Sequence, residues 1–321
     1  MFYDTFKLPF GMSDVDAYSV WLGQLVSYRL EYYPPPLSHA LFVYIVIYLG
    51  GLKSLLWFIP LLLCIVIPFS LYIFYRSLEL DVSDSFWSVM VFIFGTFSLI
   101  YFSFTAVYCQ ILAFMLFILS LRAYTKKSWI CFIILMIMGI ISHYMVSLAY
   151  GILFLSEILR AKKYVFVVAY IIILLVCIIY FRLLGFITIF SSYTLPEPSL
   201  YIMLFVFSCP FFIPILFFTK LRTKFNIFFI LLLIITPFTQ GGRGLPFMHI
   251  FLAPYAFSGY MNVRKILPPI KIIDYVFAIM VLLWFGYFFS YMAHNMALEF
   301  VFRGLDAEKL TVLGFYISLS H

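Results

Sequence analysis

Long apolar runs separated by short polar links dominate the sequence after its first fifty residues. The runs cover roughly 54–74, 85–104, 107–121, 128–142, 145–159, 164–181, 199–218, 226–238, 246–262 and 272–292. Most of them approach the roughly 20 residues that cross a bilayer as an α-helix. The pattern predicts an all-α, polytopic transmembrane helix bundle of about ten spans.

The shorter apolar run at 38–52 fits either a thin span or a helix lying at the membrane surface. The Lys and Arg clusters between the later runs decide between them: Arg76, then 122–127, 160–163, 220–224 and 264–271. If 38–52 does not cross and the N-terminal loop lies outside, every cluster faces the cytoplasm, as the positive-inside bias requires. If it crosses, all of them face outwards. We therefore expect an interfacial helix at 38–52.

This topology predicts one transmembrane domain over residues 1–321, in a multi-pass protein of the cell (plasma) membrane. Residues 1–37 form an outward acidic loop, 54–292 the helical bundle and 293–321 an outward tail. The composition agrees with a membrane protein, because 66% of the residues are hydrophobic, 10% are charged and the mean hydropathy is +1.13. The net charge of +7 lies in the links, where it sets topology, so we expect no nucleic-acid partner.

Two carboxylates, Asp14 and Asp16, flank Val15 in the outward loop. Positions i and i+2 of an extended backbone point the same way, so both carboxylates can face one substrate or one divalent cation. A carboxylate whose pKa is raised beside a membrane suits a general base. The competing interpretation is a pair of solvated loop acids, with Asp14 capping a helix.

A second polar group follows in the same loop, around the rigid turn Pro34–Pro36. Proline favours the first helical position, and Tyr33 suits the headgroup level as an anchor. Arg29, Glu31 and His39 make the segment more polar than anchoring requires, so we include them with Tyr33 as candidate substrate-binding residues.

Polar residues also interrupt later apolar runs near the predicted outer face. Tyr108 and Gln110 begin one run and offer hydrogen bonds to a sugar hydroxyl, although bonding between helices explains them equally well. His143 breaks the run from 130 to 159 and is either a helix-to-helix hydrogen bonder or a ligand-binding residue. Glu157, on the inner side, is better explained by pairing with Arg160 or the lysines that follow.

A glycine-rich segment, 239–246, places Arg243 at the predicted outer membrane boundary. Its glycines permit a close approach of the backbone, and arginine binds phosphate through a planar fork of donors. Arg243 is therefore either a phosphate ligand at headgroup depth or an arginine that snorkels to the interface.

Taken in order, these segments resemble the GT-C superfamily of integral-membrane glycosyltransferases, which use polyprenyl-phosphate-linked sugars. The resemblance rests on Asp14–Asp16, Tyr33–Leu37, Phe104–Phe114, Ile141–Leu148 and Arg243–Pro254, and it extends over most of the chain. It implies transfer of a sugar from a polyprenyl-phosphate (dolichyl-phosphate-like) donor to a glycan, lipid or protein acceptor on the outer face.

By the same resemblance, Asp14 or Asp16 deprotonates the acceptor hydroxyl and Arg243 holds the donor phosphate. Some members of the superfamily carry a divalent metal (Mg²⁺ or Mn²⁺) at the acidic loop and others do not, so both options stay open for Asp14 and Asp16. The superfamily places a transmembrane helix before this loop, whereas residues 1–13 are too short and too polar to form one. We expect a longer N-terminus or a partner subunit to supply that helix.

Two other classes of protein compete with this prediction. A transporter, flippase or polymerase of lipid-linked oligosaccharides would carry charged residues along a mid-membrane pathway and often inverted repeats, neither of which is clear in the sequence. A non-catalytic subunit of a membrane complex would also suit the missing first helix.

Overall fold

The computed structural model describes residues 61–96, 98–99, 102, 108–161, 165, 168, 171–172, 175, 209, 215–236, 244–266, 274–287, 290, 311–312 and 315–316. Regular structure in these residues is helical, apart from one two-residue antiparallel pair. The all-α class predicted from the sequence is confirmed to that extent. The interfacial helix predicted at 38–52 lies outside the described residues.

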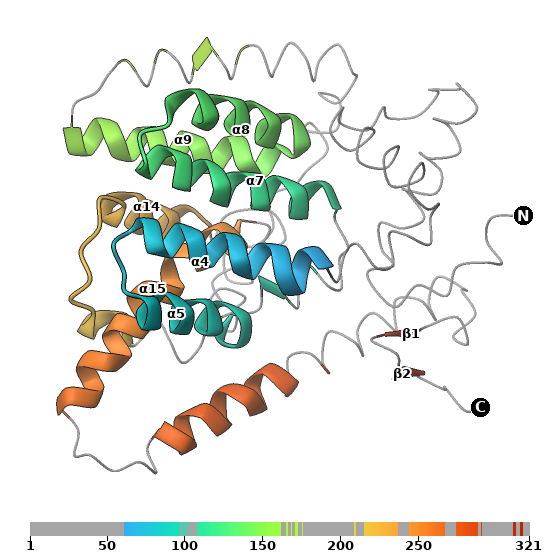
Figure 1. Cartoon of the computed structure of the whole chain (residues 1–321), viewed down its shortest axis with the longest axis vertical. Helices are drawn as coiled ribbons and strands as arrows, with labels where there is room; N and C mark the ends of the chain where they lie inside the picture. The colour runs from blue at the N-terminus through green and yellow to red at the C-terminus, as the bar shows by residue number, and fades with distance from the viewer. Residues whose placement is uncertain are drawn as a thin grey trace, which may run out of the picture.

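The elements follow one another along the chain from blue to red in Figure 1. They are η2 (Leu62–Val66, a π-helical turn), α4 (Ile67–Ser77), α5 (Val82–Gly95), α7 (Tyr108–Thr125), α8 (Trp129–Ser142), α9 (Tyr144–Ala161), η3 (Leu216–Phe218, a 3₁₀ turn), α14 (Asn226–Ile235), α15 (Leu245–Ile266), β1 (Thr311–Val312) and β2 (Phe315–Tyr316). Residues 274–287 are helical as well.

Within the described residues, no single helix is both long enough and apolar enough to traverse a bilayer. The arrangement of ten spans therefore stays a prediction.

The end of α5 differs from the sequence prediction, which extended this helix to residue 104. The helix ends at Gly95, and Thr96 is extended, with φ −127° and ψ 156°. The Thr96 hydroxyl donates to the Phe92 carbonyl over 2.7 Å. A threonine that bonds its own backbone competes with helix formation, which explains a break that hydropathy alone does not reveal.

A tight turn joins α7 to α8 and makes them an antiparallel pair. Lys127 has a positive φ of 58°, and its N–H donates to the Tyr124 carbonyl over 3.2 Å. The Ser128 N–H donates to the Ala123 carbonyl over 2.9 Å. These two bonds close a Schellman motif, which satisfies carbonyls left over at the end of α7.

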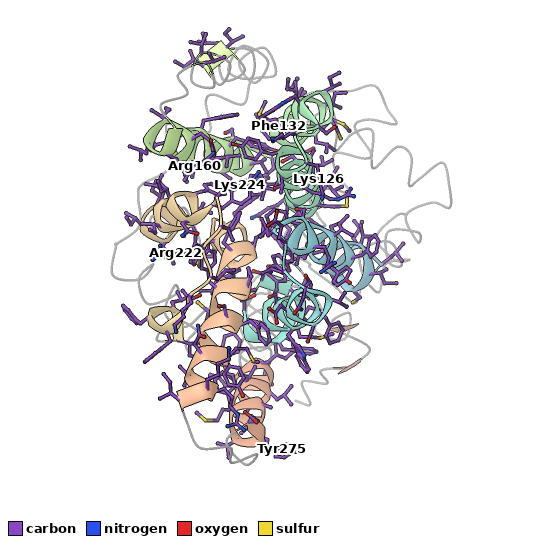
Figure 2. The ribbon with its side chains drawn as sticks, turned by 60° about the vertical axis from the view of Figure 1, so that its left-hand side comes forward. Lys126, Phe132, Arg160, Arg222, Lys224 and Tyr275 are labelled. Atoms are coloured by element: carbon purple, nitrogen blue, oxygen red, sulfur yellow. The ribbon has the colours of Figure 1, made fainter. Side chains whose placement is uncertain are left out.

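The basic links meet at one end of the bundle, which we call the basic end. The α4–α5 link, the α7–α8 turn, the end of α9, the segment 219–225 and the end of α15 all lie on the left in Figure 1. The Lys224 ammonium lies 4.5 Å from the centre of the Tyr124 ring, and the Thr223 hydroxyl is 2.8 Å from that of Tyr255. Figure 2 shows Lys126, Arg160, Arg222 and Lys224 in one region, far from Tyr275.

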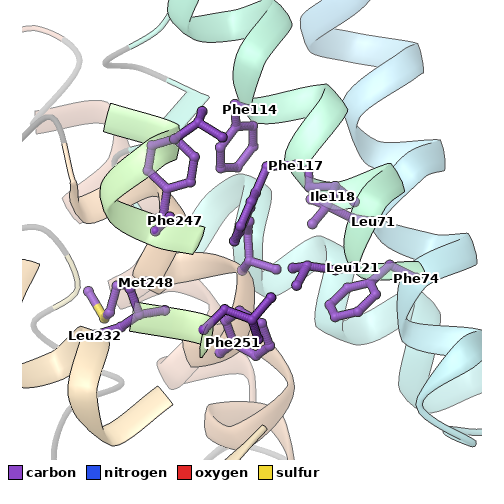
Figure 3. Close-up of a cluster of buried hydrophobic side chains, with 14 of the residues drawn as sticks. Leu71, Phe74, Phe114, Phe117, Ile118, Leu121, Leu232, Phe247, Met248 and Phe251 are labelled. Atoms are coloured by element: carbon purple, nitrogen blue, oxygen red, sulfur yellow. The ribbon is translucent and has the colours of Figure 1, made fainter. Parts of the chain in front are cut away.

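The core is unusually aromatic and centres on α7 (Figure 3). The Phe117 ring lies 5.1 Å from Tyr150 of α9 and 5.3 Å from Phe247 of α15. Phe251 extends the cluster to α14 and α4, since it lies 5.1 Å from Phe228 and 5.8 Å from Phe74. Edge-to-face pairs of this kind add roughly 0.5–1.5 kcal/mol each beyond area burial, so the cluster fixes α15 against several helices at once.

α15 continues through Pro254, a residue that removes one backbone bond from a helix interior. The carbonyl deprived of its donor is that of Ile250, four residues earlier. The Tyr75 hydroxyl of α4 donates to this carbonyl over 2.7 Å, and both groups are buried. A side chain from another helix thus replaces the missing N–H, and α15 remains one helix.

Candidate functional site

The end of the bundle opposite the basic end carries a group of buried polar side chains. This polar end consists of Ser98, Gln110, His143 and His249. Gln110 lies near the start of α7, and His143 directly follows α8. Because α7 and α8 are antiparallel, the start of one and the end of the other lie at the same end of the bundle (Figure 1).

Ser98 and His249 form the best defined contact at the polar end. The Ser98 hydroxyl lies 2.7 Å from Nδ1 of His249, and both side chains are fully buried. The two residues are 151 positions apart, so their contact joins the segment after α5 to the first turns of α15. The Ser98 N–H also lies 3.5 Å from the Thr96 hydroxyl, which links the pair to the break that ends α5.

Gln110 and His143 occupy the positions at which the sequence predicted polar breaks. Gln110 is fully buried, and His143 is 8% exposed. His143 is extended, with φ −160° and ψ 132°, and its N–H donates to the Gly139 carbonyl over 3.1 Å. It thus ends α8 and permits α9 to start at the next residue. Tyr108, the third polar residue predicted in these runs, is the first residue of α7, and the structure describes its backbone alone.

The first turns of α15 lie close to Gln110. The Phe247 ring is 5.4 Å from Phe114, which follows Gln110 by one helical turn. Gly244 comes just before the helix, and its carbonyl accepts the Phe247 N–H over 3.1 Å. The chain therefore enters the bundle at the polar end directly after position 243.

Most residues predicted for the site lie outside the described part of the chain. They are Asp14, Asp16, Arg29, Glu31, Tyr33, His39 and Arg243. Among the described residues, no three His, Cys, Asp or Glu side chains gather as metal ligands would. Magnesium or manganese binding at Asp14 and Asp16 stays a prediction.

The chemistry of the polar end is that of hydrogen bonding. A serine hydroxyl, an amide and two imidazoles can each donate and accept, and all are held in apolar surroundings. Such groups suit sugar hydroxyls, because hydrogen bonds strengthen where water is excluded. The described residues of this end include no carboxylate.

The prediction that Glu157 pairs with Arg160 is confirmed at the basic end. Two bonds join the guanidinium to the carboxylate, of 2.7 Å and 3.2 Å. Burial raises the pKa of Tyr124 well above its ordinary value, and the nearby Glu157 carboxylate raises it further. The hydrogen bond to Glu157 likewise raises the pKa of Arg160.

Sequence reasoning missed His249 and Ser98. His249 stands in the apolar stretch after Arg243, and a lone ionisable residue within such a stretch is itself a functional signal. Ser98 carries no comparable signal, because serine is common in apolar helices and its partner is distant in sequence.

Comparison of the chain with models of known protein families, with curated proteins and with solved structures gives no match.

Proposed function

We propose that this chain is an integral-membrane glycosyltransferase that transfers a sugar from a polyprenyl-phosphate donor to an acceptor at the outer face. The observation that carries the proposal is the separation of two ends: the basic links gather at one, and buried polar groups at the other. A membrane enzyme that takes a lipid-linked sugar on the outer face needs its basic residues on the cytoplasmic side and its hydrogen-bonding groups on the outer side.

The outward faces of the helices support a location in the bilayer. α8 contains no charged residue, and its exposed stripe consists of Ile130, Ile133, Ile134 and Ile137. Ile130 is 78% exposed. Residues spaced in this way share one helix face, which in a water-soluble protein would be polar. Residues 274–287 repeat the pattern with exposed Val276, Ile279, Met280 and Leu283. Contact with lipid would explain the exposed apolar faces of both helices.

The polar end supports a donor site close to the start of α15. Gln110 and His143 would bind sugar hydroxyls, and Arg243, directly before the first turn of α15, would bind the donor phosphate. Asp14 or Asp16 would remove the proton of the acceptor hydroxyl, with or without a bound divalent cation. The sugar anomeric carbon then bonds the acceptor oxygen as its bond to phosphate breaks, and polyprenyl phosphate leaves.

The test follows the leaving group, so the acceptor need not be known. Purified full-length protein in lipid nanodiscs is supplied with a panel of polyprenyl-phosphate hexoses and membrane extract, and released polyprenyl phosphate is measured by mass spectrometry. We expect release by the wild type and at least a ~100-fold loss in Asp14→Asn or Asp16→Asn, the effect of losing a general base. Arg243→Gln should raise the donor KM, and Lys265→Gln at the basic end is the control.

Full activity in both aspartate variants would rule out the proposed base. Lengthening of a lipid-linked oligosaccharide, with no transfer to another acceptor, would favour a polymerase instead. A chain that washes off membranes at alkaline pH would contradict the membrane location.

A further inference from the structure

The charges of the basic end are divided unequally between two sectors. The α7–α8 turn, the last turn of α9 and the segment 219–225 form what we call the basic sector. Its exposed cations are Arg122, Lys126, Lys127, Arg160, Lys220 and Arg222. Glu157 is its one carboxylate among the described residues, and this charge is already matched by Arg160.

The second sector, formed by the α4–α5 link, the end of α15 and the start of 274–287, is balanced. Arg264 pairs with Asp274 over 2.8 Å. Burial and neighbouring Asp81 raise the pKa of Asp84, while Lys265 lowers it, so Lys265 acts on that carboxylate across the sector. Cations here have acidic neighbours, whereas the described residues give Lys126, Lys127 and Arg222 no ion-pair partner. The positive field is therefore concentrated on the basic sector.

A buried tyrosine holds the basic sector together. The Tyr124 ring lies 5.6 Å from Trp129, 5.4 Å from Phe132 and 6.0 Å from Phe225. Lys224 lies over the same ring, and the Glu157 carboxylate of α9 is near enough to raise the pKa of the Tyr124 hydroxyl. Side chains from α7, α8, α9 and the segment 219–225 thus lie around one residue, which joins the elements that carry the cations.

The cations of the α7–α8 turn adjoin an apolar surface. Lys126 and Lys127 precede Trp129, which is 42% exposed, and the exposed isoleucine stripe of α8 begins at Ile130. The surface thus changes from charged to aromatic to aliphatic along α8. A phospholipid changes in the same order, from a charged phosphate through the glycerol region to the acyl chains. Tryptophan at the boundary is typical of the membrane interface. An acidic protein or a nucleic acid would satisfy the cations and leave the apolar stripe uncovered.

We propose that the basic sector binds anionic phospholipids of the cytoplasmic leaflet, with phosphates at Lys126, Lys127 and Arg222 and acyl chains along the stripe of α8. Clusters of Lys and Arg at a cytoplasmic membrane surface attract anionic headgroups, and the concentrated charge selects these over zwitterionic lipids. The proposal rests on the membrane location proposed above and does not depend on glycosyl transfer.

Native mass spectrometry of the full chain, released from nanodiscs of equal phosphatidylglycerol and phosphatidylcholine, tests this site. The wild type should retain phosphatidylglycerol preferentially. The variant K126Q/R222Q should lower the ratio of retained phosphatidylglycerol to phosphatidylcholine at least about fivefold. The control R76Q/K265Q removes one lysine and one arginine from the balanced sector and should leave the ratio nearly unchanged. Raising the salt concentration should lower the wild-type ratio, a measurement that needs no variant.

Each outcome separates this proposal from the enzymatic one. The lipid site would be overturned if the wild type retained the two lipids equally. It would also be overturned if the lipid ratio fell equally in K126Q/R222Q and R76Q/K265Q. Neither result would affect the transfer assay. An unchanged ratio in K126Q/R222Q would overturn it too and favour an acidic protein partner. A chain that stays in water without detergent would overturn the lipid site together with the membrane location.

Discussion

Gly259 provides a sharp test of how α15 packs. A Cβ atom added at this position would lie 2.3 Å from the Ile215 carbonyl oxygen, 2.9 Å from Ile215 Cγ2 and 3.1 Å from the carbonyl carbon. Two of these three atoms belong to the backbone, which cannot rotate out of the way. Asn262 Nδ2 also donates to the Phe218 carbonyl over 3.0 Å and holds the same segment against α15. Gly259→Ala therefore requires the backbone at 215 to move.

Two opposing effects set the size of the change. Alanine stabilises a helix interior by about 1 kcal/mol relative to glycine. Forcing an extra carbon into a packed contact costs about 1–3 kcal/mol, and the upper part of this range applies where backbone must shift. We expect the clash to exceed the gain, so that Gly259→Ala lowers the free energy of unfolding by about 1–2 kcal/mol.

Two other glycines are matched controls. A Cβ at Gly286 would meet no atom within 4 Å, so Gly286→Ala should be neutral or stabilising. At Gly139 a Cβ would lie 3.3 Å from Val146 Cγ1, a side-chain atom that can shift. The free energy of unfolding of Gly139→Ala should therefore lie between those of the other two variants. The assay is thermal unfolding of the purified chain followed by circular dichroism. A Gly259→Ala variant as stable as Gly286→Ala would refute the close approach of α15 to residue 215.

Two hydrogen bonds give further predictions. Tyr75→Phe should destabilise the fold by about 1–3 kcal/mol, because it leaves the buried Ile250 carbonyl without a donor. In a Pro254→Ala background, where residue 254 regains its N–H, thermal unfolding should show a smaller cost, and an equal cost would contradict the replacement role of Tyr75. Ser98→Ala should cost a similar amount by depriving buried His249 of a partner. Ser98→Thr, which keeps the hydroxyl, is its control, and equal unfolding midpoints for the two would refute this role.

The positions of several helices follow from the sequence alone. The apolar runs 107–121, 128–142 and 145–159 predict α7, α8 and α9 within a few residues, since charged links cannot continue an apolar run. The pairing of Glu157 with Arg160 is also local, because residues three apart share a helix face. The early end of α5 was missed, since one threonine does not interrupt the average hydropathy of an apolar run and its bond to Phe92 is a matter of conformation.

The polar end is only partly predictable for a different reason. Gln110 and His143 each interrupt an apolar run, so each is visible as a local anomaly. The contact of His249 with Ser98 depends on packing between α15 and the segment after α5, and no spacing rule relates residues 151 positions apart. Sequence patterns thus indicate which residues are unusual, while the fold determines which of them meet.

Pro254 shows how such packing bears on the proposed function. Proline in a helix interior predicts a break or kink that would separate the two halves of α15. The Tyr75 hydroxyl satisfies the Ile250 carbonyl instead, and α15 is continuous from Leu245 to Ile266. His249 at the polar end and Lys265 at the basic end therefore stand on one element. The two ends of the bundle, with the proposed donor site at one of them, are therefore spanned by a single helix, which α4 holds intact.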